Sequence, residues 1–242
     1  VARQRSNFII TTMVFFFFAH MPLTQEVFKL LTCEAYEDAP GRFHRHLAVS
    51  PNVKCGEGPH TRWMATALGF LALYSVGIPL VGFLMLYLNR HRFEDRRFVA
   101  TYGFLFKGFE QRAPCIYWEV TLVMGRKVVM VFLLVFLSTT TALIQALSGI
   151  FFVFCCLVVH VWFKPYLNPA LDMMEALSLI TTFATLYGGL FYYLDEHDRH
   201  IEGVVGAVTP ALVGLHGFTL AMFLIVALQV ALQVLAKRNA RA

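Results

Sequence analysis

Six stretches of mainly apolar residues, each about 20 residues long or longer, dominate this chain of 242 residues. A helix needs about 20 such residues to cross the hydrocarbon of a bilayer. The stretches are residues 7–31, 63–88, 116–137, 142–163, 173–194 and 204–236. Because none alternates as barrel strands do, helices must satisfy the backbone hydrogen bonds. The pattern predicts an all-α, polytopic membrane bundle of about six transmembrane helices in one domain.

Composition supports the same class of protein. Hydrophobic residues make up 58% of the chain and charged residues 14%, whereas soluble domains are about 45–50% apolar and about 25% charged. These numbers exclude disordered, collagen-like and disulfide-scaffold chains. The net charge is +5, but the basic residues lie between the apolar stretches. They therefore indicate orientation in a lipid bilayer, and no nucleic-acid partner is expected.

The basic residues predict which side of the membrane each connection occupies. With a cytosolic N-terminus, the inner side holds twelve of them: Arg3, Arg5, Arg90, Arg92, Arg96, Arg97, Lys107, Arg112, Lys164, Lys237, Arg238 and Arg241. The outer side holds five: Arg42, Arg45, Lys54, Arg62 and Arg199. Since Lys and Arg collect on the cytosolic side, both termini are expected inside. This orientation makes 32–62 an outer loop and 89–115 a basic inner loop.

The outer loop contains Cys33 and Cys55. Two cysteines in a short extracytoplasmic loop usually pair, so the sequence predicts a disulfide between them. The alternative is a metal site that combines these cysteines with His44, His46 and His60, although the spacing matches no standard zinc template.

The third stretch contains three ionisable residues, Glu119, Arg126 and Lys127. Charges at membrane depth cost several kcal/mol each unless they are paired or hydrated. Glu119 and Arg126 are seven residues apart and are expected on one helix face. The polar residues expected to meet this face are Gln145, His160, Asp172 and Glu175. Three interpretations remain open: an ion pathway or gating network, a structural set of ion pairs, or a surface-lying first half of this helix.

Prolines and glycines add expectations about helix shape. Pro22, Pro79 and Pro210 fall within apolar stretches and predict kinks. Gly203, Gly206, Gly214 and Gly217 in the last stretch are expected to allow close helix approach. The chain contains no phosphate-binding glycine loop, zinc-protease motif, nucleophile elbow or CxxC pair. We therefore expect no enzyme activity, no cofactor and no resident metal.

Several short motifs resemble those of a known group of membrane proteins. The motif residues are Tyr102, Gly103, Phe104, Leu105, Trp118, Glu119, Arg126, Lys127, Gln145, Pro165, Tyr166, Asn168 and Glu175. Together with the C…C…H pattern of the outer loop, they resemble the membrane region of transient-receptor-potential-like surface proteins of algae and other microbial eukaryotes. That group is distantly similar to the fungal family of the same name.

The resemblance implies that the chain is the C-terminal membrane part of a larger surface protein in the plasma or ciliary membrane. It implies a channel-like domain, either cation-conducting or mechanosensory, with other subunits or an attached ectodomain as partners. The alternative is a structural membrane anchor that holds an ectodomain or extracellular complex and transports nothing.

Overall fold

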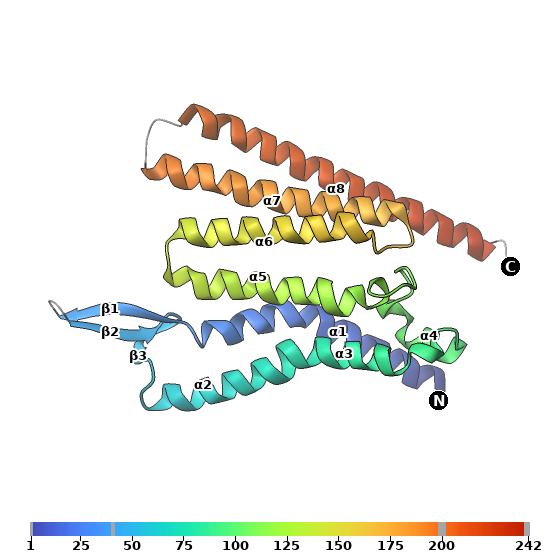
Figure 1. Ribbon diagram of the computed structural model, residues 1–242, viewed down its shortest axis with the longest axis horizontal. Coiled ribbons are helices and arrows are strands. Elements are labelled where there is room, and N and C mark those ends of the chain that lie inside the picture. The colour runs from blue at the N-terminus through green and yellow to red at the C-terminus, as the bar shows by residue number, and fades with distance from the viewer. Residues whose placement is uncertain (1, 40–41, 198–201, 240–242) are drawn as a thin grey trace. The chain divides into compact units, whose positions relative to one another are not determined.

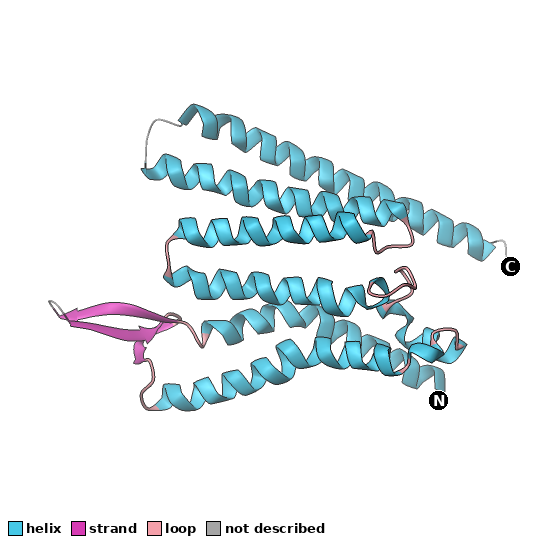
Figure 2. Ribbon diagram, in the orientation of Figure 1, coloured by secondary structure: helices cyan, strands magenta, loops and turns pink. Residues whose placement is uncertain are grey.

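The computed structural model describes residues 2–39, 42–197 and 202–239 (Figure 1). Arg199 and Arg241, which contribute to the predicted charge bias, lie outside these ranges. The chain is 80% helical and divides into two compact units, Val1–Gln145 and Ala146–Ala242. Figure 2 shows that the strands form one small group beside the helices. The prediction of an all-α chain therefore holds for most of the molecule but not for this group.

The first unit contains a long helix, a small sheet and several shorter helices. Its elements are α1 (Ala2–Lys29), β1 (Cys33–Ala39), β2 (Arg42–Leu47), β3 (Ser50–Lys54), α2 (Pro59–Phe70), α3 (Gly77–Leu88), α4 (Arg96–Tyr102) and α5 (Met124–Phe136). A π-helix, Leu71–Val76, joins α2 to α3, and a second, Glu119–Val123, leads into α5. Two of the predicted helices are thus built from α and π turns. The segment 89–115, predicted as a loop, contains the helix α4 and three-residue 3-10 turns.

The segment 32–62, also predicted as a loop, folds into a three-stranded antiparallel sheet. The strands lie in the order β1-β2-β3, and Cys33 of β1 is paired in register with Leu47 of β2. The strands are short and carry charged side chains, so they lack the apolar alternation by which half-buried strands are recognised. Backbone pairing, which sequence hydropathy does not report, forms this sheet.

A local defect in the second predicted helix follows from Pro79. Proline has no amide hydrogen, so the carbonyl of Ser75, four residues earlier, loses its usual helical donor. The π-helix Leu71–Val76 lies immediately before this point. His20 of α1 supplies a donor instead, with its Nε2 3.0 Å from the Ser75 carbonyl oxygen. A kink was predicted at Pro79; the structure has a π-helix directly before it and a hydrogen bond from His20 of α1 to the carbonyl that Pro79 leaves free.

Two apolar clusters hold the first unit together. In one, Phe28 of α1 packs on Val131 and Val135 of α5, with the Phe28 and Phe136 ring centroids 5.3 Å apart. The other joins α3, α4 and the turns on either side of the 3-10 helix at Cys115; its buried members are Leu86, Phe98, Leu105, Phe106, Ile116 and Val120. These clusters fix α1 against α5, and α4 against α3.

The second unit contains the helices α6 (Ala142–Phe163), α7 (Pro169–His197) and α8 (Glu202–Asn239); the first residues of α6 belong to the first unit. In Figure 1, α7 and α8 run side by side. The close approach between them is at Gly188 of α7, where a Cβ atom would lie 2.7 Å from Leu212 Cδ1. Gly203, Gly206, Gly214 and Gly217, which were expected to allow close helix approach, do not make this contact. Among the described residues, nothing lies within 4 Å of a Cβ built on any of them.

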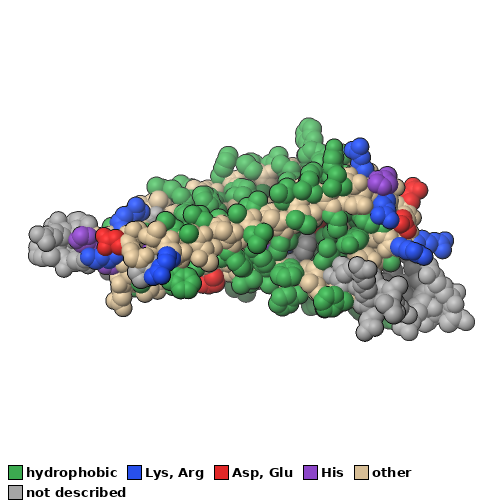
Figure 3. All heavy atoms as spheres, turned by 90° about the horizontal axis from the view of Figure 1, so that it is seen from below, with side chains coloured by type: hydrophobic (Ala, Val, Ile, Leu, Met, Phe, Trp, Pro, Cys, Tyr) green, Lys and Arg blue, Asp and Glu red, His purple; other side chains and the backbone are tan. Residues whose placement is uncertain are grey.

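Within residues 2–39, 42–197 and 202–239, four helical segments are long and apolar enough to cross a membrane: His60–Leu88, Ala142–Phe163, Pro169–Asp195 and Gly203–Leu232. They correspond to four of the six predicted stretches, and six spans are not confirmed. The continuous helix formed by Glu119–Val123 and α5 corresponds to one of the two other stretches, and it carries three charged residues, Glu119, Arg126 and Lys127. The last third of α1 is polar and includes His20, Glu26 and Lys29. On the face in Figure 3, hydrophobic side chains cover the middle and most charged side chains lie at the two ends.

Candidate functional site

The strongest candidate site lies between α1 and α5 in the first unit. Glu119 and Lys127 line one cavity of about 210 Å³, together with Val14, Phe18 and Phe104. The two ionisable side chains are half-buried and eight residues apart, which corresponds to about 12 Å along an α-helix. The cavity therefore presents a carboxylate and an ammonium group in an otherwise apolar lining.

Lys127 lines the cavity with Glu119, and the expected shared face of Glu119 and Arg126 stays a prediction. The sequence placed Glu119 and Arg126 on one face, at a spacing of seven. Glu119 begins a π-helix, whose turns hold more residues than α turns. Lys127 follows Glu119 at a spacing of eight, and Arg126 is not among the described residues that line the cavity. π turns inside helices are frequent at functional sites.

A buried polar cluster, which sequence reasoning missed, joins α1 to the π-helix beside Pro79. His20 is completely buried, its ring stacks on Tyr74 at a centroid distance of 5.7 Å, and it lies within electrostatic range of Lys127. Thr24 Oγ1 lies 2.8 Å from Ser75 Oγ, and the Tyr74 hydroxyl donates to the Phe16 carbonyl at 3.3 Å. Two sequence features could have predicted this cluster: a histidine within an apolar stretch, and a proline that leaves a backbone carbonyl without its helical donor.

In the second unit, two predicted site residues meet at the turn between α6 and α7. His160 Nε2 lies 3.0 Å from the backbone carbonyl oxygen of Asp172 and 3.8 Å from its Oδ1. The same Oδ1 accepts the amide hydrogen of Tyr166 at 3.2 Å. Glu175 is half-buried one turn further along α7. His160 and Asp172 therefore tie the two ends of this turn together.

The family-motif residues of this turn have structural roles. Asn168 Oδ1 accepts the amide hydrogen of Ala170 at 3.0 Å, which caps the start of α7. Pro165 is fully buried, and Lys164 before it has a left-handed backbone with φ of 43°. The motif residues of this segment therefore stabilise the tight turn between α6 and α7.

The first group of motif residues, 102–105, also forms a packed turn. Tyr102 ends α4, and Gly103, Phe104 and Leu105 form a 3-10 turn, in which Leu105 is 1% exposed. A Cβ at position 103 would lie 3.2 Å from Val99 Cγ1, so the position favours glycine. Trp118 is also buried. Phe104 lines the cavity of Glu119 and Lys127, which connects this motif to the candidate site.

The remaining predicted polar residue, Gln145, donates from Nε2 to the Leu134 carbonyl at 2.6 Å. It therefore links the start of α6 back to α5. Glu119 and Lys127 belong to the first unit, whereas His160, Asp172 and Glu175 belong to the second. A single network through all of them stays a prediction.

A polar seam between α7 and α8 was also missed from the sequence. Thr181 Oγ1 lies 2.8 Å from Thr219 Oγ1, and Thr185 Oγ1 lies 3.3 Å from His216 Nε2. Further along, Tyr192 and Thr209 are joined through their hydroxyl groups. Residue numbers rise along α7 as they fall along α8, so the helices are antiparallel. The sequence feature that could have predicted this seam is the recurrence of hydroxyl side chains every three, four or seven residues, which places them on one helix face.

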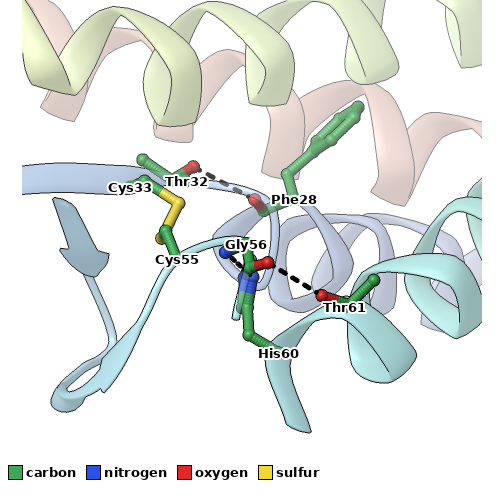
Figure 4. Close-up of a disulfide and its surroundings, with 7 residues drawn as sticks. All are labelled: Phe28, Thr32, Cys33, Cys55, Gly56, His60 and Thr61. Atoms are coloured by element: carbon green, nitrogen blue, oxygen red, sulfur yellow. Dashed lines mark hydrogen bonds between the residues drawn. A yellow bond between two sulfur atoms is a disulfide. The ribbon is translucent and has the colours of Figure 1, made fainter. Parts of the chain in front are cut away.

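The disulfide prediction is confirmed: Cys33 and Cys55 are bonded (Figure 4). Beside it, the Gly56 amide donates to His60 Nδ1 at 3.0 Å, and Thr61 Oγ1 donates to the Gly56 carbonyl at 3.1 Å. Gly56 has φ of 79°, a left-handed conformation that glycine adopts without strain. These contacts hold the turn between β3 and α2 against the cystine.

The alternative prediction for these cysteines was a metal site shared with the histidines of the outer loop. Among the described residues, His60 is the one histidine near the two sulfurs, with its ring nitrogen and both Sγ atoms within 4.8 Å of one another. His44 and His46 lie on β2 and do not join this group. Metal ligation requires thiolates, which a cystine lacks, and the Nδ1 lone pair of His60 already accepts a hydrogen bond. The arrangement favours a structural cystine.

Cys115 is a buried free thiol at the end of the basic segment. Burial raises the pKa of this thiol above its ordinary value. It is therefore protonated and unreactive at neutral pH, in contrast to a catalytic cysteine. Cys155 and Cys156 in α6 are also free thiols.

Comparison with known proteins gives one partial similarity. No family model matches the chain, and no solved structure matches it. The chain is similar to Cysteine repeat modular protein A of Toxoplasma gondii, with 36% identity over 117 residues. The match covers 46% of this chain and 4% of the relative, so the chain corresponds to a small part of a very large protein.

Proposed function

We propose that this chain is a channel-like membrane domain of a larger surface protein, either cation-conducting or mechanosensory. The observation that carries the proposal is the cavity lined by Glu119 and Lys127. Ionisable groups at membrane depth are costly and are typical of ion paths, relays and gates. The π turn that begins at Glu119 and the motif resemblance support the same proposal.

The proposal predicts opposite effects of neutralising the two cavity charges. Glu119→Gln should lower the cation current about tenfold, because a carboxylate worth roughly 1.4 kcal/mol to a passing cation changes its occupancy by that factor. Lys127→Gln should raise the current, because it removes a repulsive charge from the same cavity. The measurement is single-channel recording of the full-length protein in planar bilayers.

A matched control is available on α1. Glu26→Gln removes an exposed carboxylate that pairs with Lys29 at 2.8 Å, away from the cavity. This variant should conduct like the wild type. Currents that are equal in all variants, or that move in the same direction for Glu119→Gln and Lys127→Gln, would contradict a conducting role for the cavity.

A second candidate function is a structural anchor that holds an ectodomain or extracellular complex. It is favoured by the similarity to a 4% portion of a large protein whose name describes cysteine-repeat modules. The packing roles of the motif residues around Leu105 and Asn168 fit an anchor equally well. In this case replacement of the domain by an unrelated multi-span anchor should preserve the function of the whole protein. Loss of function on such replacement would favour the channel-like domain.

We further propose six spans with both termini in the cytosol, in the plasma or ciliary membrane. Four apolar helices and the distribution of Lys and Arg support this topology. The critical connection is the segment 32–62, which contains Cys33 and Cys55, whose disulfide fits an oxidising, extracytoplasmic side.

Glycosylation acceptor sites inserted on either side of the membrane test this topology. A site placed in the turn after β2, at Ala48–Val49, should be modified in the secretory pathway. One placed beside Arg92 should not. The reverse pattern would show that the orientation is opposite to the proposed one. Modification at both positions would show that the segment between them does not span the membrane.

A further inference from the structure

A second, larger cavity lies on the first unit, away from the charged site. It is an apolar groove of about 310 Å³ between α1 and the helix from α2 to α3. Its lining includes Met13, Phe16, Leu73, Val81, Met85 and Leu105. Among the described lining residues, Tyr74 has the one polar side chain, and its hydroxyl already donates to the Phe16 carbonyl. The groove therefore suits the hydrocarbon part of a ligand.

The lining residues of the groove are spread along the helix from α2 to α3. Its lining extends from Leu73 to Met85, which is about 18 Å at the rise of an α-helix. That length is close to one leaflet of a hydrocarbon core about 30 Å thick. Val81, 63% exposed, opens onto the surface of the helix that is apolar enough to cross the membrane. An extended acyl chain matches these dimensions better than a compact ring system.

Basic residues lie at the Met85 and Leu105 end of the groove. Arg90 follows Met85 by five residues, and its guanidinium lies 5.1 Å from the centroid of the Tyr87 ring. Lys107 follows Leu105 by two residues and is exposed. Of the acidic groups in this segment, Asp95 caps α4 and Glu110 pairs with Arg112 at 2.6 Å, whereas Glu94 is exposed. Among the described side chains, Arg90 and Lys107 make no ion pair.

We propose that this groove binds one acyl chain of an anionic phospholipid, whose phosphate headgroup lies at Arg90 and Lys107. The hydrocarbon lining accounts for the chain, and the two unpaired cations account for the preference for negative charge. This lipid site is independent of whether the domain conducts ions.

The test is native mass spectrometry of the purified full-length protein with phosphatidylserine and phosphatidylcholine of identical acyl chains. Wild type should retain phosphatidylserine in preference to phosphatidylcholine. Val81→Trp fills the groove and should weaken retention of phosphatidylserine about tenfold, the effect of losing two or more buried CH₂ groups. Leu80→Trp, on the adjacent exposed position outside the lining, should bind like wild type.

The headgroup is tested separately. Arg90→Gln and Lys107→Gln should each reduce the preference for phosphatidylserine about fivefold, and leave binding of phosphatidylcholine unchanged. Met85→Trp repeats the groove test one helical turn further along α3, in case Val81→Trp fails to fold. Equal retention in Val81→Trp and Leu80→Trp, no preference for the anionic lipid, or displacement of phosphatidylserine by cholesterol would each overturn the proposal.

Discussion

Replacement of both Cys33 and Cys55 by alanine is expected to destabilise the sheet by about 3 kcal/mol. The disulfide closes a segment with a sequence separation of 22 residues, and its loss restores the conformational freedom of that segment in the unfolded chain. The sheet buries few apolar side chains, Leu47 among them, so little else compensates. Hydrogen exchange of the β1 and β2 amides, followed by mass spectrometry, measures the loss directly.

The control for this prediction is chemical reduction. Dithiothreitol should accelerate exchange in the wild-type sheet and have no further effect on the Cys33→Ala/Cys55→Ala variant. Cys155→Ala removes a free thiol from α6 and should leave exchange in β1 and β2 unchanged. Protection of β1 and β2 that survives in the double variant would show that the backbone ladder, rather than the cystine, stabilises the sheet.

The second large effect is expected at Gly188 of α7. A Cβ atom there would lie 2.7 Å from Leu212 Cδ1 and 3.2 Å from Val208 Cγ1, so leucine must displace these side chains of α8 or the helix itself. The contact sits between two hydrogen-bonded pairs of the seam, Thr185 with His216 and Tyr192 with Thr209. Overpacking of this kind costs about 2 kcal/mol. Unfolding of Gly188→Leu in detergent, followed by circular dichroism, measures the cost.

Gly189 provides a control in the next residue. Nothing described lies within 4 Å of a Cβ at position 189, and leucine there brings the same gain in helix propensity. Gly189→Leu should therefore be more stable than Gly188→Leu by about 2 kcal/mol. Equal stabilities would mean that α7 and α8 do not pack through Gly188.

Much of the helical architecture could be predicted from hydropathy. The α6 helix begins and ends where its apolar stretch does, at Ala142 and Phe163, and α7 and α8 extend theirs by a few residues. Helix ends depend on capping, which hydropathy does not report: Asn168 caps α7 five residues before the apolar stretch begins. The sheet was missed for a related reason, since its strands are polar and pair through the backbone.

The candidate site was only partly predictable. Glu119 and Lys127 stand out in the sequence because ionisable residues are rare in apolar stretches. Their joint place in one cavity depends on the helix geometry after the π turn at Glu119, which brings Lys127 to the cavity lining. The contribution of His20 depends on a carbonyl freed by Pro79, 59 residues away in sequence. Neither effect follows from periodicity alone.

By itself, the sequence determined that the chain is rich in membrane-length helices and that Cys33 pairs with Cys55. Both follow from local quantities: apolar length sets what can cross hydrocarbon, and two cysteines in one short segment meet easily. Only the tertiary structure decided which polar groups meet, such as Thr185 with His216 or Glu119 with Lys127 around one cavity. Such contacts depend on how one helix is rotated against another, and that rotation is set by close packing at positions such as Gly188.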